Sequence, residues 1–124
     1  MDFSIDAALQ ADHDRLRAFV RDEIVPLEAD RKNYDSYGNI DMAVLQTLRA
    51  KVKAAGLWAP QIPREQGGLG YGPTGMAVLY EAMNYSIFGP VAFNCAAPDD
   101  GNMYILNKVA NQAQEDRWLT PIIN

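Results

Sequence analysis

Apolar side chains in the first part of the chain recur at the spacing of a helix that buries one face. Between residues 5 and 33 they follow a period near 3.6 with charged residues between them: Leu9, Leu16, Phe19, Val20, Ile24 and Leu27. Pro26 lies inside this run, and because proline disrupts a helix interior, we expect a kink or a split there. A second amphipathic helix is predicted from Asp41 to Ala55, ended by Gly56.

The middle of the chain predicts a third helix between two irregular segments. Pro73 suits a first helical position, where its missing N–H costs nothing, and we expect this helix to reach Ser86. Breaks are predicted at Gly89–Pro90 and again at the "PDDG" of residues 98–101, with a short apolar piece between them.

The end of the chain predicts two more helices. "NMYILNKVA", residues 102–110, is typical of a short helix, and Asn111 with Gln114 resembles a capping box that opens a last helix over 112–123. No segment has the pattern of a strand. The sequence therefore predicts a single all-α domain over 1–124, built as a bundle of about five to six helices.

One long stretch is almost uncharged. From Gln66 to Pro98 the only charged residue is Glu81, and the third helix is apolar nearly all round. Such a helix needs partners on every side. It could be the central helix of a small bundle, or part of its surface could be covered by another domain, a subunit or a long apolar ligand.

Composition excludes several functional classes. A chain of 124 residues with 16 acids against 11 bases, and a net charge of −5, is a poor partner for the phosphates of nucleic acid. The single Cys95 excludes an internal disulfide, and with His13 alone it gives no set of metal ligands. Neither a secretion signal nor a membrane-spanning run is visible, so we expect a cytoplasmic protein.

The glycine-rich stretch "REQGGLGYGPTG" over 64–75 resembles a phosphate-binding loop only at first sight. Gly67 and Gly72 have the spacing of the P-loop, but Pro73 stands where that motif has its lysine. A dinucleotide fingerprint fails as well, because its third glycine would also fall on Pro73. The glycines therefore indicate tight turns of the backbone and not a phosphate cradle.

Three side chains that could carry chemistry have simpler structural interpretations. His13, flanked by charged residues on the first helix, is expected to lie in water. Cys95 belongs to an apolar run and is expected to be a buried, inert thiol. We expect Trp118 to anchor the last helix in the core.

An ordered set of short motifs runs through most of the chain, from about residue 5 to 124. After a helix these are Gly56–Leu57, Pro63, Glu65, the run Gly67–Gly68–Leu69–Gly70, a helix with Glu81, and a closing set of Gln114, Arg117, Trp118, Leu119 and Pro121. This order resembles the N-terminal helical domain of the acyl-CoA dehydrogenases. The segment "FNCAAPDDGNMYILNKV" is similar to the branch of mammalian members ten and eleven.

The resemblance implies a flavoenzyme of three domains: this one, a β-domain and a C-terminal helical bundle. Such enzymes take a proton and a hydride from an acyl thioester, pass the hydride to FAD, and usually deliver electrons to an electron-transferring flavoprotein. Full-length members are expected to be homo-oligomers. The family's catalytic Glu lies in the C-terminal bundle and many flavin contacts lie in the β-domain. The resemblance therefore implies no catalytic residue in this chain, no flavin contact that can be assigned to it, and no activity of the chain alone.

The resemblance also implies that this domain forms part of the wall of the acyl-CoA pocket. The residues that we expect there are Glu81, Tyr85, Asp99 and Asn102. An apolar helix suits an acyl chain, because burying each methylene is worth about 0.8 kcal/mol. Glu81 could instead pair with a distant arginine or reach solvent, and Asp99 with Asp100 could simply form a turn and a helix cap.

A shallow apolar hollow on this domain accepts a leucine-bearing loop of the electron-transferring flavoprotein in the family. The matching positions are Leu57, Leu69, Tyr71 and Leu79, of which Tyr71 departs from the leucine that the family often has. Two other functions remain open from the residues alone. One is a free-standing helical module that binds a partner protein through the same apolar face, and the other is a small lipid-binding bundle.

Overall fold

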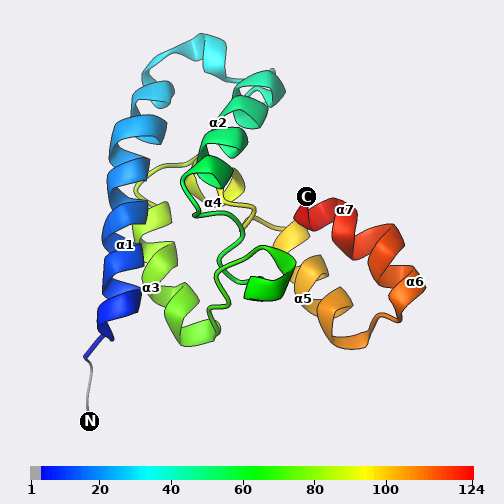
Figure 1. The fold of residues 1–124 in the computed structure, drawn as a ribbon. Coiled ribbons are helices and arrows are strands. Elements are labelled where there is room, and N and C mark those ends of the chain that lie inside the picture. The colour runs from blue at the N-terminus through cyan, green and yellow to red at the C-terminus, as the bar shows by residue number, and fades with distance from the viewer. Residues whose placement is uncertain (1–3) are drawn as a thin grey trace.

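The computed structural model describes residues 4–124, and the regular elements in that range are helical (Figure 1). They are α1 (Ala7–Phe19), the π-helical η1 (Val20–Ile24), the 3-10 helices η2 (Val25–Ala29) and η3 (Arg31–Asn33), α2 (Met42–Ala54), the 3-10 helix η4 (Arg64–Gln66), α3 (Pro73–Met83), α4 (Gly89–Ala92), α5 (Asp99–Val109), α6 (Gln112–Gln114), the π-helical η5 (Glu115–Leu119) and α7 (Thr120–Ile123). Because α6, η5 and α7 form one continuous run, these are six helices beside the short 3-10 turns, and the predicted all-α bundle is confirmed. Residues 1–3 of the predicted domain lie outside the described part.

The first long helix begins at a side-chain cap and changes its winding ahead of a proline. The Asp6 carboxylate accepts hydrogen bonds from the backbone N–H of Ala8 and Leu9, at 3.0 and 2.9 Å. In a continuous α-helix the Pro26 ring would collide with the carbonyl of the residue four positions earlier. The chain avoids this clash by forming the π turn η1 followed by the 3-10 turn η2. The predicted disruption of the helix at Pro26, a kink or a split, thus takes the form of a change of winding. A π turn also precedes Pro121 at the same spacing, and there it is followed by the α-helical α7.

The second helix has both predicted ends. Asp41 caps α2 by accepting a hydrogen bond from the N–H of Ala43 at 2.9 Å, and Gly56 follows the helix with φ +67°, a conformation that favours glycine. Its buried stripe of Leu45, Leu48 and Val52 faces the rest of the bundle.

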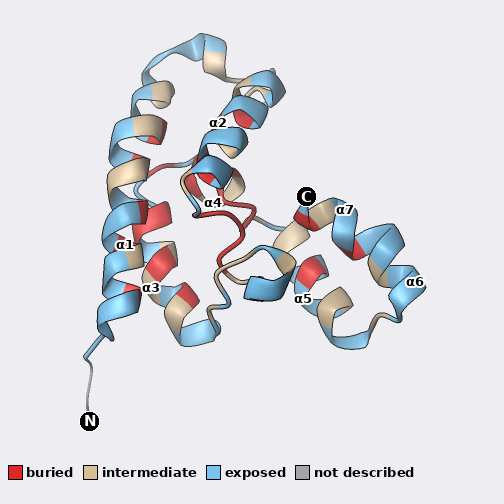
Figure 2. Ribbon diagram, viewed as in Figure 1, coloured by how far each residue is buried: buried red, intermediate tan, exposed pale blue. Residues whose placement is uncertain are grey.

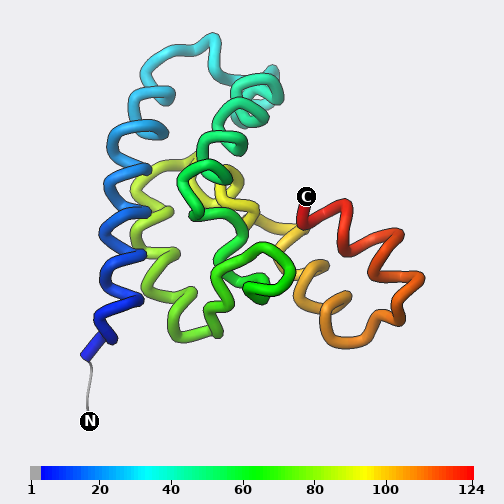
Figure 3. The backbone as a smooth tube through the Cα atoms, viewed as in Figure 1, coloured from blue at the N-terminus to red at the C-terminus, as the bar shows by residue number. Residues whose placement is uncertain are grey.

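The third helix lies beside α1 (Figures 1 and 3), and it is shorter than predicted. α3 ends at Met83, and a turn leads to Gly89, which opens α4 instead of breaking the chain. A Cβ added at Gly89 would collide with the carbonyl oxygen of Met83, so only glycine fits there. Pro90 is tolerated because it lies in the first turn of α4.

The last helices form a hairpin at one side of the bundle (Figures 1 and 3). α5 already begins at Asp99, so the "PDDG" segment is the start of a helix and not the predicted break. Acidic side chains in a first turn are favourable because they face the positive end of the helix dipole. The predicted capping box is confirmed: Asn111 N–H donates to Gln114 Oε1 at 2.9 Å, and Gln114 N–H donates to Asn111 Oδ1 at 3.0 Å.

Most of the large apolar side chains in the uncharged stretch from Gln66 to Pro98 are buried or half-buried by the chain itself (Figure 2). The buried apolar side chains of this stretch are Met76, Leu79, Ala82, Met83, Phe88, Ala92, Phe93 and Cys95. The large apolar side chains that it leaves exposed are Tyr85 at 56% and Ile87 at 68%. The first interpretation, a central helix of a small bundle, thus accounts for most of this stretch, and α3 packs against both α1 and α4.

Exposed apolar side chains gather instead on the C-terminal hairpin. Tyr104, Ile105, Val109 and Trp118 are all more than half exposed. The expectation that Trp118 anchors the core is wrong, because the buried stripe of this helix runs through Leu119 and Ile123, and Trp118 lies one position off it under the Arg117 guanidinium. Within the described residues, no helix is long and apolar enough to cross a membrane.

Candidate functional site

A groove of about 810 Å³ lies between the loop of residues 61–73 and one face of α5. Its apolar lining includes the buried Ile62 and Met76, the half-buried Tyr71 and Tyr80, and the exposed Tyr104. The α5 wall consists of Asp100, Gly101, Tyr104, Asn107 and Lys108, which share one helix face because they repeat at intervals of three and four residues. Two bases and two acids line the groove: Arg64, Lys108, Glu65 and Asp100.

The glycine loop that forms the opposite wall satisfies its own backbone donors. The N–H groups of Gly67, Gly68 and Gly70 donate to the carbonyls of Arg64, Pro63 and Ile62, at 3.1, 3.1 and 2.8 Å. A Cβ at Gly68 would collide with the Ile62 carbonyl oxygen, and Gly70 has φ +74°. No donor of this set points outward to hold a phosphate, so the interpretation of these glycines as turn residues is confirmed.

Tyr71 fastens this loop to α1. Its hydroxyl donates to Asp12 Oδ2 at 2.7 Å, and Asp12 also accepts from the Arg15 guanidinium at 2.7 Å. Burial, followed by the hydrogen bond to Asp12, raises the pKa of Tyr71 to about 12. The Tyr71 ring packs so closely on α3 that a Cβ at Gly75 would come within 2.8 Å of it.

The four residues predicted to dock a flavoprotein occupy two different environments. Leu57 and Leu79 are core residues, 2% and 0% exposed. Leu69 and Tyr71 are half-buried at the surface, where Leu69 helps to line a smaller cavity of about 380 Å³ beside Trp58. A partner could therefore touch Leu69 and Tyr71 directly, whereas the other two could act only from beneath the surface.

The residues predicted to line a substrate pocket do not gather in the groove. Glu81 is exposed on α3, and Tyr85 is exposed with the Arg17 guanidinium 4.5 Å from its ring centroid. Asp99 and Asn102 lie in the first turn of α5, half-buried and exposed respectively. None of the four lines the groove.

Their immediate neighbours, Tyr80 and Asp100, do face each other across the groove. The Tyr80 hydroxyl lies 2.9 Å from Asp100 Oδ2 and 2.9 Å from the Cys95 carbonyl oxygen. Sequence reasoning missed this pair, although Tyr80 lies four residues after Met76 and so shares its helix face. The pair connects α3 to the start of α5 and fixes one end of the groove.

Cys95 and Tyr80 are both held in their protonated forms. Burial, with a smaller contribution from the charge of Asp100, raises the pKa of the Cys95 thiol. Burial is also the main reason that the pKa of Tyr80 is raised. The Cys95 thiol donates to Gln61 Oε1 at 3.1 Å, and the expected burial of this thiol is confirmed. In the described residues no group of three or more His, Cys, Asp or Glu is placed to hold a metal ion.

His13 differs from its prediction. It is only 9% exposed, so the expectation that it lies in water is wrong. Its ring Nδ1 lies 3.2 Å from Asp14 Oδ1, and this contact, followed by a hydrogen bond from Gln10, lowers the pKa of Asp14.

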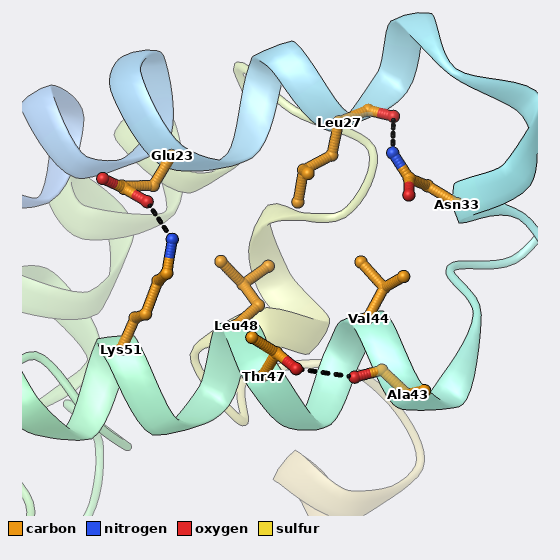
Figure 4. Close-up of a pocket in the computed structure, with 8 residues that line it drawn as sticks. All are labelled: Glu23, Leu27, Asn33, Ala43, Val44, Thr47, Leu48 and Lys51. Carbon is orange, nitrogen blue, oxygen red and sulfur yellow. Dashed lines mark hydrogen bonds and ion pairs between the residues drawn. The ribbon is translucent and has the colours of Figure 1, made fainter.

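A second cavity, of about 390 Å³, lies between α2 and the η1–η2 segment (Figure 4). Leu27, Val44 and Leu48 point into it. At one end Lys51 and Glu23 form an ion pair of 2.7 Å, so the charged groups of this cavity are already paired with each other.

Comparison with known proteins identifies the fold. The family model for the acyl-CoA dehydrogenase N-terminal domain matches residues 7–124. The chain belongs to the acyl-CoA dehydrogenase family. It is similar to acyl-CoA dehydrogenase family member 10 of Mus musculus, with 31% identity over 90% of this chain and 11% of that protein. Family member 11 of Rattus norvegicus is 30% identical over 88% of this chain and 14% of that protein, so the predicted resemblance to members ten and eleven is confirmed.

Two mycobacterial relatives match nearly the whole chain. FadE2 of Mycobacterium tuberculosis, assigned by its name to the acyl-CoA dehydrogenases, is 34% identical over 100% of this chain and 31% of that protein. A solved Mycobacterium abscessus structure with the same assignment superposes with a TM-score of 0.81 at 31% identity, over 98% of this chain and 32% of that one. The acyl-CoA dehydrogenase N-terminal fold is thus shown, and the chain spans less than a third of these relatives.

Proposed function

We propose that this chain serves as the N-terminal domain of an FAD-dependent acyl-CoA dehydrogenase, where it forms part of the acyl pocket wall and contacts the other domains. The observation that supports this most is the family match over residues 7–124, together with a relative of known structure that superposes on 98% of the chain. The reaction of the whole enzyme is α,β-dehydrogenation of an acyl thioester.

The described residues do not by themselves fit a flavin. The N–H groups of Gly67, Gly68 and Gly70 are bonded to carbonyls of their own loop, and the Tyr80 and Cys95 protons are bonded within the fold. The cofactor, which supplies the hydride acceptor, is therefore proposed to be held by other domains of the full-length enzyme. The catalytic base is likewise assigned to another domain, and this chain alone is proposed to be inactive.

The contribution of this chain is to shape the pocket. Asp99 and Asn102 lie at the start of α5, and Glu81 with Tyr85 adds polar surface at the far end of α3. The hydrogen bond between the Tyr80 hydroxyl and Asp100 holds the first turn of α5 against α3. Docking of an electron-transferring flavoprotein is proposed at Leu69 and Tyr71, over the buried Leu57 and Leu79.

A domain exchange tests the proposal. In the Mycobacterium tuberculosis relative, the matching third is replaced by this chain, and the purified chimera is compared with the isolated 124-residue chain. We expect the chimera to carry flavin, seen as yellow absorbance, and acyl-CoA to bleach it, whereas the isolated chain stays colourless. A chimera that folds and retains flavin but is never reduced by any acyl-CoA contradicts the proposed pocket role.

A second candidate function is supported by the exposed apolar side chains of the hairpin. Ile105 and Val109, at 58% and 74% exposure, lie one turn apart on α5 and could bind a separate partner protein. A stable complex of the isolated chain with a protein unrelated to dehydrogenases, lost in Val109→Ser, would favour this function.

A further inference from the structure

The groove between loop 61–73 and α5 has the form of a seat for another helix. Its α5 wall runs from Asp100 to Lys108, which is about 12 Å or two turns at 1.5 Å per residue. Positions 100, 104 and 107 are spaced like the ridges over which a neighbouring helix packs. Tyr71, Pro73 and Tyr104, which are half-buried or exposed, give the groove apolar surface for the apolar face of an amphipathic helix.

Glycines on both walls allow a backbone to come close. Gly72 on the loop side and Gly101 on α5 both line the groove, and a Cβ added at either would meet no atom within 4 Å. These positions therefore leave open space without any side chain to fill it. A helix can approach such walls more closely than it could approach leucine or phenylalanine.

The charged side chains at the rim of the groove indicate which polar groups the occupant carries along its edge. Asp100 is engaged by the Tyr80 hydroxyl, while Arg64, Glu65 and Lys108 are exposed and form no ion pair with the described residues 4–124. The Lys108 ammonium lies 5.9 Å from the Tyr104 ring centroid, at the mouth of the groove. An acidic side chain on the occupant would complete this site.

We propose that the groove seats an amphipathic helix from the remaining part of the full-length enzyme, with an acidic residue of that helix paired to Lys108. This inference rests on the proposed function, because it takes the occupant from the two thirds of the relatives that this chain does not match. A separate helix is favoured over a small ligand by the paired glycine walls and by the helical spacing of the α5 residues. The groove is thus the interdomain contact site through which this domain is held against the rest of the enzyme.

The test separates the chain from its partner. The unmatched two thirds of the Mycobacterium tuberculosis relative are expressed as their own polypeptide, and their binding to this chain is measured by calorimetry. We expect Gly101→Phe, which fills the groove, to weaken binding at least tenfold, and Gly101→Ala to leave it unchanged. Lys108→Glu is expected to weaken binding about tenfold, whereas Lys32→Glu, an exposed lysine on η3, is expected to have no effect.

Several results overturn the inference. Equal binding by Gly101→Phe and wild type places the helix elsewhere, and displacement of the partner by octanoyl-CoA identifies the groove as a ligand site. An active chimera whose two parts do not bind in trans also contradicts it, and this result leaves the proposed function intact. An inactive chimera with groove-dependent binding would instead contradict the proposed function and support the proposed helix-binding role of the groove. Circular dichroism of each variant verifies that it is folded.

Discussion

The indole Nε1 of Trp58 donates a 2.7 Å hydrogen bond to the backbone carbonyl oxygen of Ile123. Trp58 belongs to the loop after α2, and Ile123 is the last residue of α7, so this bond fastens the C-terminal hairpin to the bundle. The Lys53 ammonium lies 4.4 Å from the centroid of the same ring, and Asn94 Nδ2 donates to the Ile122 carbonyl at 2.9 Å nearby. These polar contacts fasten the end of the hairpin, in addition to the burial of Met103, Leu119 and Ile123 in the core.

Trp58→Phe is expected to loosen the hairpin. It removes the donor and leaves the Ile123 carbonyl unsatisfied in a buried position, which costs about 1–3 kcal/mol of the free energy of unfolding. Urea unfolding followed by circular dichroism measures this loss. The matched control is Trp118→Phe, which changes an exposed ring and is expected to stay within about 0.5 kcal/mol. Equal losses in the two variants would contradict the fastening role of Trp58.

Gly89→Ala is expected to be strongly destabilising. The new methyl group would collide with the Met83 carbonyl oxygen, and relief requires the backbone between α3 and α4 to move, at a cost of about 1–3 kcal/mol or more. Gly101→Ala places the same methyl group in open space on a helix and is expected to stabilise by up to about 1 kcal/mol. Thermal unfolding of the pair gives shifts of opposite sign if this geometry is right.

Replacing Glu28 is expected to lower the free energy of unfolding much more than replacing Glu81. Glu28 Oε1 accepts from the Ser86 hydroxyl at 2.6 Å and from the Ile87 N–H at 3.2 Å, so Glu28→Ala removes two hydrogen bonds to a charged group. We expect a loss of about 1.5–3 kcal/mol, measured by urea unfolding. Glu81→Ala, at an exposed position, is expected to change stability by less than about 0.5 kcal/mol. A large effect of Glu81→Ala would reveal a structural role that its exposure does not suggest.

Alkaline unfolding is expected to depend on Tyr71. Its pKa is raised from 10.0 to about 12, so the folded state favours the neutral hydroxyl. That contribution to stability is fully present below pH 10 and is lost as the pH rises towards 12. Urea midpoints measured across this range should therefore fall more steeply for the wild type than for Tyr71→Phe. Parallel curves for the two proteins would show that neither the burial of this hydroxyl nor its hydrogen bond to Asp12 produces the pH dependence.

Cys95 is expected to resist thiol reagents in the folded protein. It is 4% exposed, so a reagent cannot easily reach it, and burial raises the pKa of its thiol, so little of it is thiolate at neutral pH. The reaction with an aromatic disulfide reagent should be slower by orders of magnitude in buffer than in denaturing urea. Rapid labelling without denaturant would mean that this part of the chain opens readily.

Features decided by neighbouring residues were predictable from the sequence. The cap of α2 at Asp41 and the capping box at Asn111 require only side chains within three residues, and both are present. The end of α3 was not predictable, because Gly89 is needed by a close approach to Met83 that no local pattern reveals.

In the candidate site too, the sequence indicates features set by neighbouring residues but not those set by contacts between distant segments. The residues that meet at one end of the groove, Tyr80 and Asp100, each adjoin one that the family motifs indicated, Glu81 and Asp99. Which side of a nearly uniform apolar helix faces inward depends on its packing against α1, and a sequence pattern without polar contrast cannot fix that rotation.

The two wide turns ahead of Pro26 and Pro121 bear on how this chain aligns with its relatives. A π turn closes its hydrogen bond over five residues and therefore contains one residue more than an α turn. Deleting that residue would turn the π turn into an α turn and leave the faces of the helix beyond it in register. Relatives without these prolines are therefore expected to show a one-residue gap at each place, with the inward-facing positions beyond it kept in phase.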